Sequence, residues 1–345
     1  MGSYADAHRP GIYAFGFDSD ARVIEARATY AGIANPSFLV VHPIWRCLYA
    51  VSELSAGPNG ASGSVCAFQF ESESGVLQPI NRQSSGGAAP CHLALDISGR
   101  WLVVSNYASG TICVLPITED GALAEPTHLV QTTHPGWQGE PHAHSATFAP
   151  DGRFVLVADL GLDQIVVYAF DAKAGRLDRH GHVNTRPGAG PRHLAFHPGG
   201  LILYAANELD STISVYEYDA VTGYLRGRQS LPTLPPGAPE NSAADLHIAP
   251  DGARLYVSNR GHDSIAVFDI GAEGALTAGA IQPSGGRWPR NFALEPGGRF
   301  MLIANQYSGN VAVLPLLDNE AGLGGAMVWA AVPATSCVQF VESQT

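Results

Sequence analysis

The segment LAFHPGGLILYAANELDSTISVYEY, residues 194–218, carries the pattern from which the fold can be predicted. It contains a short alternating strand, a Gly-containing turn, a second apolar strand, a polar loop and a third strand. Apolar residues at alternate positions are typical of strands, and glycine supplies the positive φ that a tight hairpin requires. The segment therefore predicts an antiparallel sheet whose first two strands form a hairpin.

The same layout recurs along the chain. Four clear copies and a weaker one are LALDISGRWLVVSNYASGTICVLPI (93–117), ATFAPDGRFVLVADLGLDQIVVYAF (146–170), LHIAPDGARLYVSNRGHDSIAVFDI (246–270), FALEPGGRFMLIANQYSGNVAVLPL (292–316) and FLVVHPIWRCLYAVSEL (38–54). The turn positions are Gly99, Gly152, Gly200, Gly252 and Gly298, with Trp45 at the equivalent place in the weaker copy. A fourth, poorer strand follows most copies, and a period of about 46–54 residues is typical of four-stranded propeller blades.

The two ends of the chain supply one more blade. GIYAFGFDSDARVIEARATY (11–30) has the pattern of third and fourth strands, and SCVQFV (336–341) has that of a first strand. We therefore predict an all-β, seven-bladed β-propeller of four-stranded antiparallel blades, a single domain over residues 1–345. Closure of the last blade by N- and C-terminal strands removes exposed sheet edges. A two-sheet β-sandwich would not explain six equivalent copies.

The composition restricts the partners. Lys+Arg 19 against Asp+Glu 31 gives a net charge of −12, which argues against nucleic acid and anionic membranes, although a local arginine cluster can still bind a small anion. No run of ~20 apolar residues could span a membrane, and MGSYADAHRPG lacks the features of a signal peptide. The five cysteines show no CxxC spacing. We expect free thiols, a cytoplasmic protein and, since a closed ring needs no partner, a monomer.

Candidate site residues emerge from comparing the copies position by position. Hairpin residues equidistant from the turn should lie side by side at its far end. Eight positions before the turn stand Ser37, Cys91, His144, Arg192, Ala244 and Arg290; eight positions after it stand Glu53, Tyr107, Leu160, Glu208, Arg260 and Gln306. A purely structural position should carry similar residues in every copy. These two columns change charge type from blade to blade, which indicates a functional site on one face of a repeated scaffold.

The chemistry of these columns suggests acid–base catalysis next to an anion site. His144 and Glu208 can exchange protons near neutral pH, and Arg192, Arg260 and Arg290 can hold an anion or a developing oxyanion. Simple solvated polarity at the channel mouth is the alternative. His142 and His144 form an HxH pair that could ligate zinc, but two more ligands would be needed. Cys91 lacks an evident triad for a nucleophilic role.

Several long motifs resemble a known family. They are GGAAPCHLALDISGRWLVVSNY, PHAHSATFAPDGRFVLVADLG, GPRHLAFHPGG with NELDSTISVY, SNRGHDSIAVF, and WPRNFALEPGGRF with ANQ. Together they resemble the lactonase family of seven-bladed propellers, which includes 6-phosphogluconolactonases, carboxy-cis,cis-muconate cyclases and sugar-acid lactonases. The resemblance implies active residues at the His of PHAHS, the Arg of GPRH, the Glu of NELDS and the Arg of NRGHDS, which are His144, Arg192, Glu208 and Arg260. It implies no metal and no cofactor. Two departures are Asn291, where relatives often have His, and HPIWR in place of a PDGR-like turn.

The expected function is hydrolysis of the δ-lactone of an anionic sugar acid, either 6-phosphogluconolactone or an aldarate- or uronate-derived lactone. His144 and Glu208 would handle protons, while Arg192 and Arg260 would bind the anion and offset the oxyanion. The remaining candidates for substrate binding are His142, Arg290, Gln306 and Glu53. The alternatives are a lactonising muconate cyclase and a non-catalytic ligand- or protein-binding propeller.

Overall fold

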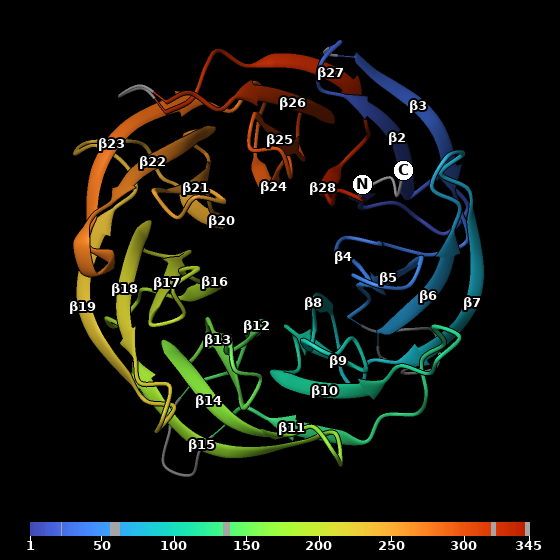
Figure 1. Ribbon diagram of the computed structural model, residues 1–345, viewed down its shortest axis with the longest axis horizontal. Helices are drawn as coiled ribbons and strands as arrows, with labels where there is room; N and C mark the ends of the chain where they lie inside the picture. The colour runs from blue at the N-terminus through green and yellow to red at the C-terminus, as the bar shows by residue number, and fades with distance from the viewer. Residues whose placement is uncertain (22, 56–62, 134–138, 319–321, 342–345) are drawn as a thin grey trace.

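Seven sheets are arranged around a central axis in the computed structural model, which describes residues 1–21, 23–55, 63–133, 139–318 and 322–341 (Figure 1). In these ranges every sheet has four antiparallel strands, and the first strand of each blade lies innermost. This confirms the predicted all-β, seven-bladed propeller. The short 3-10 turn Ala272–Gly274 is the one helical segment in the described ranges.

The six blades that follow the repeat use consecutive strands. Their bounds are β4 Leu39–Val41, β5 Cys47–Ser52, β6 Ser64–Phe70, β7 Leu77–Ser84; β8 Pro90–Leu95, β9 Trp101–Asn106, β10 Thr111–Pro116, β11 His128–Gln131; β12 Ala143–Phe148, β13 Phe154–Asp159, β14 Gln164–Asp171, β15 Arg176–Asn184; β16 Pro191–Phe196, β17 Ile202–Asn207, β18 Thr212–Tyr218, β19 Leu225–Pro232; β20 Ser242–Ile248, β21 Arg254–Arg260, β22 Ser264–Ile270, β23 Leu276–Pro283; and β24 Pro289–Leu294, β25 Phe300–Asn305, β26 Asn310–Pro315, β27 Met327–Ala331.

The core lies between neighbouring blades. Second strands such as β9 and β13 are buried along their whole length, because a sheet packs against each face, whereas the outer β15 alternates buried and exposed residues. One cluster, for example, joins Val103 and Val114 of one blade to Val155, Val157 and Tyr168 of the next. The apolar runs that predicted second strands therefore reflect burial on both faces.

The hairpin turns follow the predicted glycine pattern. Gly99, Gly152, Gly200, Gly252 and Gly298 all adopt positive φ, between 69° and 76°. The weaker copy closes its turn without a positive φ at Trp45, and the Nδ1 atom of His42 accepts hydrogen bonds from the backbone N–H groups of Ile44 and Trp45. The departure in HPIWR is thus a capped turn that does not require glycine.

The seventh blade, here called the closing blade, combines both ends of the chain in the order β28 Thr335–Cys337, β1 Gly2–Ser3, β2 Ile12–Asp18 and β3 Val23–Tyr30 (Figure 1). The predicted third and fourth strands are confirmed. The predicted first strand is shorter than SCVQFV, since it ends at Cys337. Its partner β1 was not expected from sequence; Gly2 pairs with Cys337 and Ser3 with Thr335.

A β-bulge interrupts the inner strand of five blades at the same place. The ladder register shifts around Cys91, His144, Arg192, Ala244 and Arg290, which form the column eight positions before the turn. Bulged residues leave the ladder and their side chains are re-aimed. Because of the bulge, Pro191 pairs with Asn207, and Glu208 follows the end of its strand. The hairpin argument expected equidistant residues to be ladder partners, and this was wrong because of the bulges. Both columns nevertheless lie at the end of the blades opposite the turns.

Alanine substitutions at two turns should separate backbone strain from steric clash. Gly99 and Gly298 have φ of 70° and 71°. A Cβ on Gly99 would lie 2.3 Å from the Nε2 atom of His42, whereas a Cβ on Gly298 would meet nothing within 4 Å. We expect Gly298→Ala to cost about 1–2 kcal/mol of unfolding free energy, and Gly99→Ala to cost about 1–3 kcal/mol more. Urea denaturation of both variants measures the difference; equal losses would contradict the clash.

Candidate active site

Glu208 lies between two arginines from neighbouring blades. Its Oε2 atom is 2.9 Å from Arg192 Nε and 2.8 Å from Arg260 Nη2. The arginine side chains are only 3% and 5% exposed, and the glutamate side chain is 20% exposed. Sequence comparison predicted all three residues for one site, and the fold brings them into contact. The glutamate is the side of this cluster nearest to solvent.

Local structure places each member of this cluster. Arg192 is the bulged residue of β16, Glu208 directly follows β17, and Arg260 ends β21. The Arg192 Nη1 atom also donates to the carbonyl oxygen of Ala244 at 2.6 Å, and Arg260 Nη2 donates to that of Ala243 at 3.3 Å. Backbone acceptors on β20 thus hold both guanidinium groups at the border between two blades.

The electrostatic balance favours an anionic ligand. Burial raises the pKa of Glu208, but Arg260 and Arg192 outweigh it, so the net pKa is lowered and the carboxylate stays ionised. Burial lowers the pKa of both arginines, and the neighbouring guanidinium groups lower it further. Arg290 adds a third guanidinium, with Glu53 as a second carboxylate. At the mouth itself three guanidinium groups thus face two carboxylates, while the third carboxylate that acts on Arg192, Asp245, lies deeper.

His144 is a buried imidazole with an unused nitrogen. It is 5% exposed, and its ring lies edge-on to Tyr107 and His193 at centroid distances of 5.7 and 5.2 Å. Its Nδ1 atom is buried and has no hydrogen-bond partner in the described part of the chain. Burial lowers its pKa well below the usual range, and Arg192 and His193 lower it further. The imidazole is therefore neutral at neutral pH.

His142 contacts the same aromatic ring as His144. It stacks on Tyr107 at 4.6 Å, and its Nδ1 atom is 3.0 Å from the Tyr107 carbonyl oxygen. His142 and His144 thus both contact Tyr107. Within the described ranges no three His, Cys, Asp or Glu side chains converge in a way that could hold a metal ion.

Two further predicted residues, Arg290 and Glu53, form a second group around Tyr4. The guanidinium of Arg290 lies 5.3 Å from the centroid of the Tyr4 ring, and the Tyr4 hydroxyl donates to Glu53 Oε2 at 2.8 Å. Ser37 Oγ donates to the same carboxylate oxygen. The Oε1 atom of Gln306 is buried, and no described residue donates to it. None of the hydrogen bonds of the described residues joins His144 to Glu208.

Sequence reasoning missed several residues of this face. Tyr4 belongs to a stretch outside the repeat, so no periodic signal could identify it. Trp288 lies within the quoted motif WPRNF; its ring is 5.5 Å from the Arg260 guanidinium and stacks on Tyr307 at 4.5 Å. Trp288 also has a φ of 66°, an uncommon value for a bulky residue that marks local strain.

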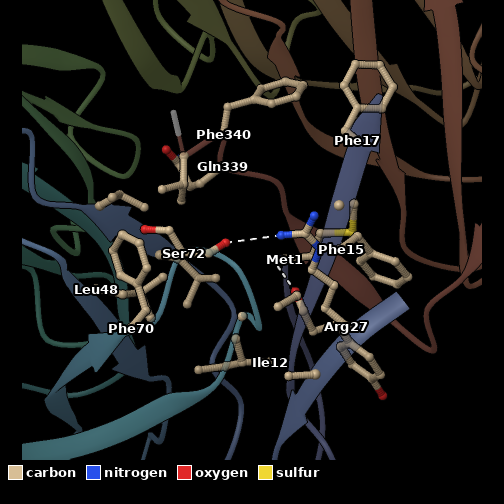
Figure 2. A pocket seen from close by; sticks show the side chains of 18 of the residues that line it. Met1, Ile12, Phe15, Phe17, Arg27, Leu48, Phe70, Ser72, Gln339 and Phe340 are labelled. Atoms are coloured by element: carbon tan, nitrogen blue, oxygen red, sulfur yellow. Dashed lines mark hydrogen bonds between the residues drawn. The ribbon is translucent and has the colours of Figure 1, made fainter. Parts of the chain in front are cut away.

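A cavity of about 510 Å³ lies at the other end of the blades (Figure 2). Its lining includes Glu295 and Pro296, which follow β24 at the end opposite to Arg290, and apolar side chains such as Phe15, Phe17 and Phe70. Met1 and the residues that follow β28, Gln339, Phe340 and Val341, also line it. None of the predicted site residues lines it. Between Ser37, Cys91, Arg192 and Arg290 the axis leaves only about 10 Å³, room for one water molecule.

The closed ring of seven four-stranded antiparallel sheets defines the class of protein, a seven-bladed β-propeller. Residues 1–340 match the family described as "Lactonase, 7-bladed beta-propeller", and the chain belongs to this family. The resemblance seen in the motifs is thereby confirmed.

Individual relatives cover nearly the whole chain. It is 33% identical over 348 residues to the 6-phosphogluconolactonase of Bacillus subtilis (strain 168), covering 99% of this chain and 97% of the relative. It is 34% identical over 325 residues to the 6-phosphogluconolactonase of Formosa agariphila, covering 91% and 90%. The solved structure of a periplasmic gluconolactonase of Pseudomonas aeruginosa matches with a TM-score of 0.90 and 31% identity, covering 99% and 98% of the two chains. None of the described segments is a helix long and apolar enough to cross a membrane.

Removal of the central carboxylate should destabilise the fold. Glu208→Ala leaves two buried guanidinium groups without a counter-ion, and we expect a loss of about 3–5 kcal/mol in unfolding free energy. Glu217→Ala is the matched control, because Glu217 also pairs with two arginines, Arg226 and Arg228 of the outer strand β19, but its side chain is 41% exposed. Thermal and urea unfolding of both variants should show a much smaller loss in the control. Similar losses in the two variants would contradict the buried-pair assignment.

Proposed function

We propose that the protein hydrolyses the δ-lactone of an anionic sugar acid, with 6-phosphogluconolactone as the leading candidate. The observation that carries the proposal is the buried, neutral His144 with an unpaired nitrogen, within the electrostatic reach of Arg192, Arg290 and Arg260. Relatives named 6-phosphogluconolactonase and gluconolactonase support the same reaction. The enzyme class is that of hydrolases acting on carboxylic ester bonds.

His144 is the proposed general base. Its neutral imidazole takes a proton from a water molecule while the water oxygen bonds to the lactone carbonyl carbon. The tetrahedral intermediate then collapses, the ring C–O bond breaks, and the imidazolium returns the proton to the departing ring oxygen. The product is the open-chain hydroxy acid. A lowered pKa keeps this base unprotonated, although it also makes the base weaker.

Glu208 has a different role in this proposal from the proton-transfer role expected from sequence. Two guanidinium groups keep it ionised, so it cannot serve as an acid near neutral pH. We assign it the task of holding Arg192 and Arg260 in place, and we assign those arginines to the substrate anion and the developing oxyanion. Arg290, His142, Gln306 and Glu53 are the proposed further contacts to the sugar acid. Gln306 is supported by its unpaired buried oxygen.

The cytoplasm remains our proposal for the compartment. All five cysteines are free and buried, which suits a reducing environment. The Pseudomonas aeruginosa relative, by contrast, is described as periplasmic.

Substitution of the proposed base tests the mechanism. His144→Ala should lower kcat by ~10²–10⁴ because general-base assistance is lost. His180→Ala is the control, since His180 lies on the outer strand β15 and contacts the Thr222 carbonyl oxygen. Rates are measured with a pH indicator on 6-phosphoglucono-, glucono-, glucaro- and galactaro-δ-lactones and on muconolactones, corrected for spontaneous opening. A near-wild-type kcat in His144→Ala would exclude the assignment.

The pH dependence provides an independent test. Protonation inactivates a general base, and the lowered pKa of His144 means that the base form persists into acid. We expect kcat/KM to stay level down to about pH 6 and to fall only below the usual histidine range. Arg290→Gln removes a cation that lowers this pKa, so the acid limb should move to higher pH. If the acid limb of the wild-type kcat/KM profile were centred near the usual histidine pKa, the assignment of the buried His144 beside arginines as the base would be contradicted.

Steady-state kinetics distinguish two roles for Arg260, binding of the substrate anion and stabilisation of the oxyanion. Arg260→Ala should mainly raise KM if the guanidinium holds the anion equally in ground state and transition state. A loss confined to kcat would show instead that Arg260 acts on the oxyanion. Arg254→Ala is the control on the same strand, because Arg254 lies near the turn end of β21, far along the strand from Arg260.

A further inference from the structure

A carboxylate that the proposed mechanism does not use is buried on the axis of the ring. Asp245 is 3% exposed and lies next to Ala244 in the bulge of β20. This bulge is larger than those of the other blades, because pairing resumes only at Leu246. The backbone N–H of Asp245 is therefore outside the ladder and donates to Ser258 Oγ at 3.0 Å.

Five donors surround this carboxylate. Its Oδ1 atom is 2.6 Å from His193 Nδ1 and accepts from Leu246 N at 3.0 Å. Its Oδ2 atom is 3.1 Å from His247 Nε2 and accepts from Asn291 Nδ2 at 2.5 Å and Phe292 N at 3.2 Å. Burial raises the pKa of Asp245, but His247, His193 and their hydrogen bonds outweigh it and hold the pKa well below its usual range. The group is a buried, ionised acceptor.

Asn291, one of the departures noted in the sequence, connects Asp245 to the end of the chain. Its Nδ2 atom donates to Asp245 Oδ2, and its Oδ1 atom accepts from Val338 N at 2.7 Å. Asn291 therefore supplies one of the donors to the carboxylate. It also connects this network to the chain beyond β28.

The hydrogen bonds fix the tautomer of His193. Arg192 Nη1 lies 3.2 Å from His193 Nε2, and a guanidinium can only donate, so Nε2 must be the accepting nitrogen. The proton is then on Nδ1 and is donated to Asp245. Burial and the Arg192 charge lower the pKa of His193 to about 4, so the imidazole is neutral. The chain of contacts runs from Asp245 through His193 to Arg192.

We infer that Asp245 is a positioning residue for the anion site: it holds His193 as the Nδ1–H tautomer, and His193 thereby fixes the guanidinium of Arg192. The inference rests on the proposed function, because it assigns Arg192 to the substrate anion. An amide at position 245 would still fill the space. It would, however, have to turn its NH₂ group away from the donors His247 and Asn291 and toward His193. His193 would then carry its proton on Nε2, facing the N–H of Arg192.

The experiment compares Asp245→Asn with the wild-type protein by two readouts. Two-dimensional ¹⁵N NMR of the full chain, with His193→Gln identifying the signals, reports the tautomer without any substrate. Lactone kinetics then report kcat and KM. We expect an Nδ1–H tautomer in the wild type and an Nε2–H tautomer in Asp245→Asn. We also expect the KM of Asp245→Asn to be ~10–100-fold higher, the usual effect of losing a residue that orients a ligand-binding group.

Asp96→Asn is the control, because Asp96 is a buried carboxylate in the turn between β8 and β9. This variant should leave both readouts unchanged.

A double-mutant cycle separates positioning from general destabilisation. In His193→Gln, the amide can accept from Arg192 and donate to Asp245, so KM should stay within a few-fold of wild type. Because an amide has no tautomers and can rotate, Asp245→Asn should add little in the His193→Gln background.

Two outcomes would overturn the inference. One is a His193 that is protonated or carries its proton on Nε2 in the wild type, and the other is a folded Asp245→Asn with unchanged KM. If Asp245→Asn does not fold, the wild-type tautomer and the His193→Gln kinetics decide. Absence of lactone hydrolysis by the wild type, with the expected tautomer present, would count against the proposed function alone.

Discussion

Closure of the ring is the constraint on which the site depends. It is made by a very short contact, with Gly2 paired to Cys337 and Ser3 to Thr335. Closure removes the free edges of the first and last sheets and brings every inner strand to the axis. Around the axis, side chains from neighbouring blades come within hydrogen-bond distance, as Glu208 does with Arg260 and His193 with Asp245.

Two carboxylates organise the centre of the molecule at two depths. Glu208 lies toward solvent and pairs with two guanidinium groups, so it fixes the positions of the arginines that we propose bind the substrate anion. Asp245 lies deeper and is held mostly by neutral donors from three inner strands, so it anchors imidazole and amide groups. Arg192 links the two, since it contacts both Glu208 and His193. The polar centre is thus one connected network with its charged end at the mouth of the ring.

The sequence was sufficient to predict the fold because each blade repeats a local signature. Turn glycines and apolar second strands are dictated by neighbours in the chain, and both were identified correctly. The bulge at Arg192 could not be predicted, since it depends on how two strands pair. The contact of Glu208 with Arg260 crosses from blade to blade, and Tyr4 lies outside the repeat. Comparison of copies therefore named residues that the fold brings together, but not the hydrogen bonds that decide their protonation.

The bulges also have an evolutionary consequence. Cys91, His144, Arg192 and Arg290 occupy positions that the ladder does not use, so the backbone pairing of a blade makes no demand on the side chain there. A mutation at such a position can change charge, size or reactivity while the blade keeps its hydrogen bonds. New chemistry can therefore be tried one blade at a time without breaking the ladder, but a change at Arg192 must still leave Glu208 with a counter-ion.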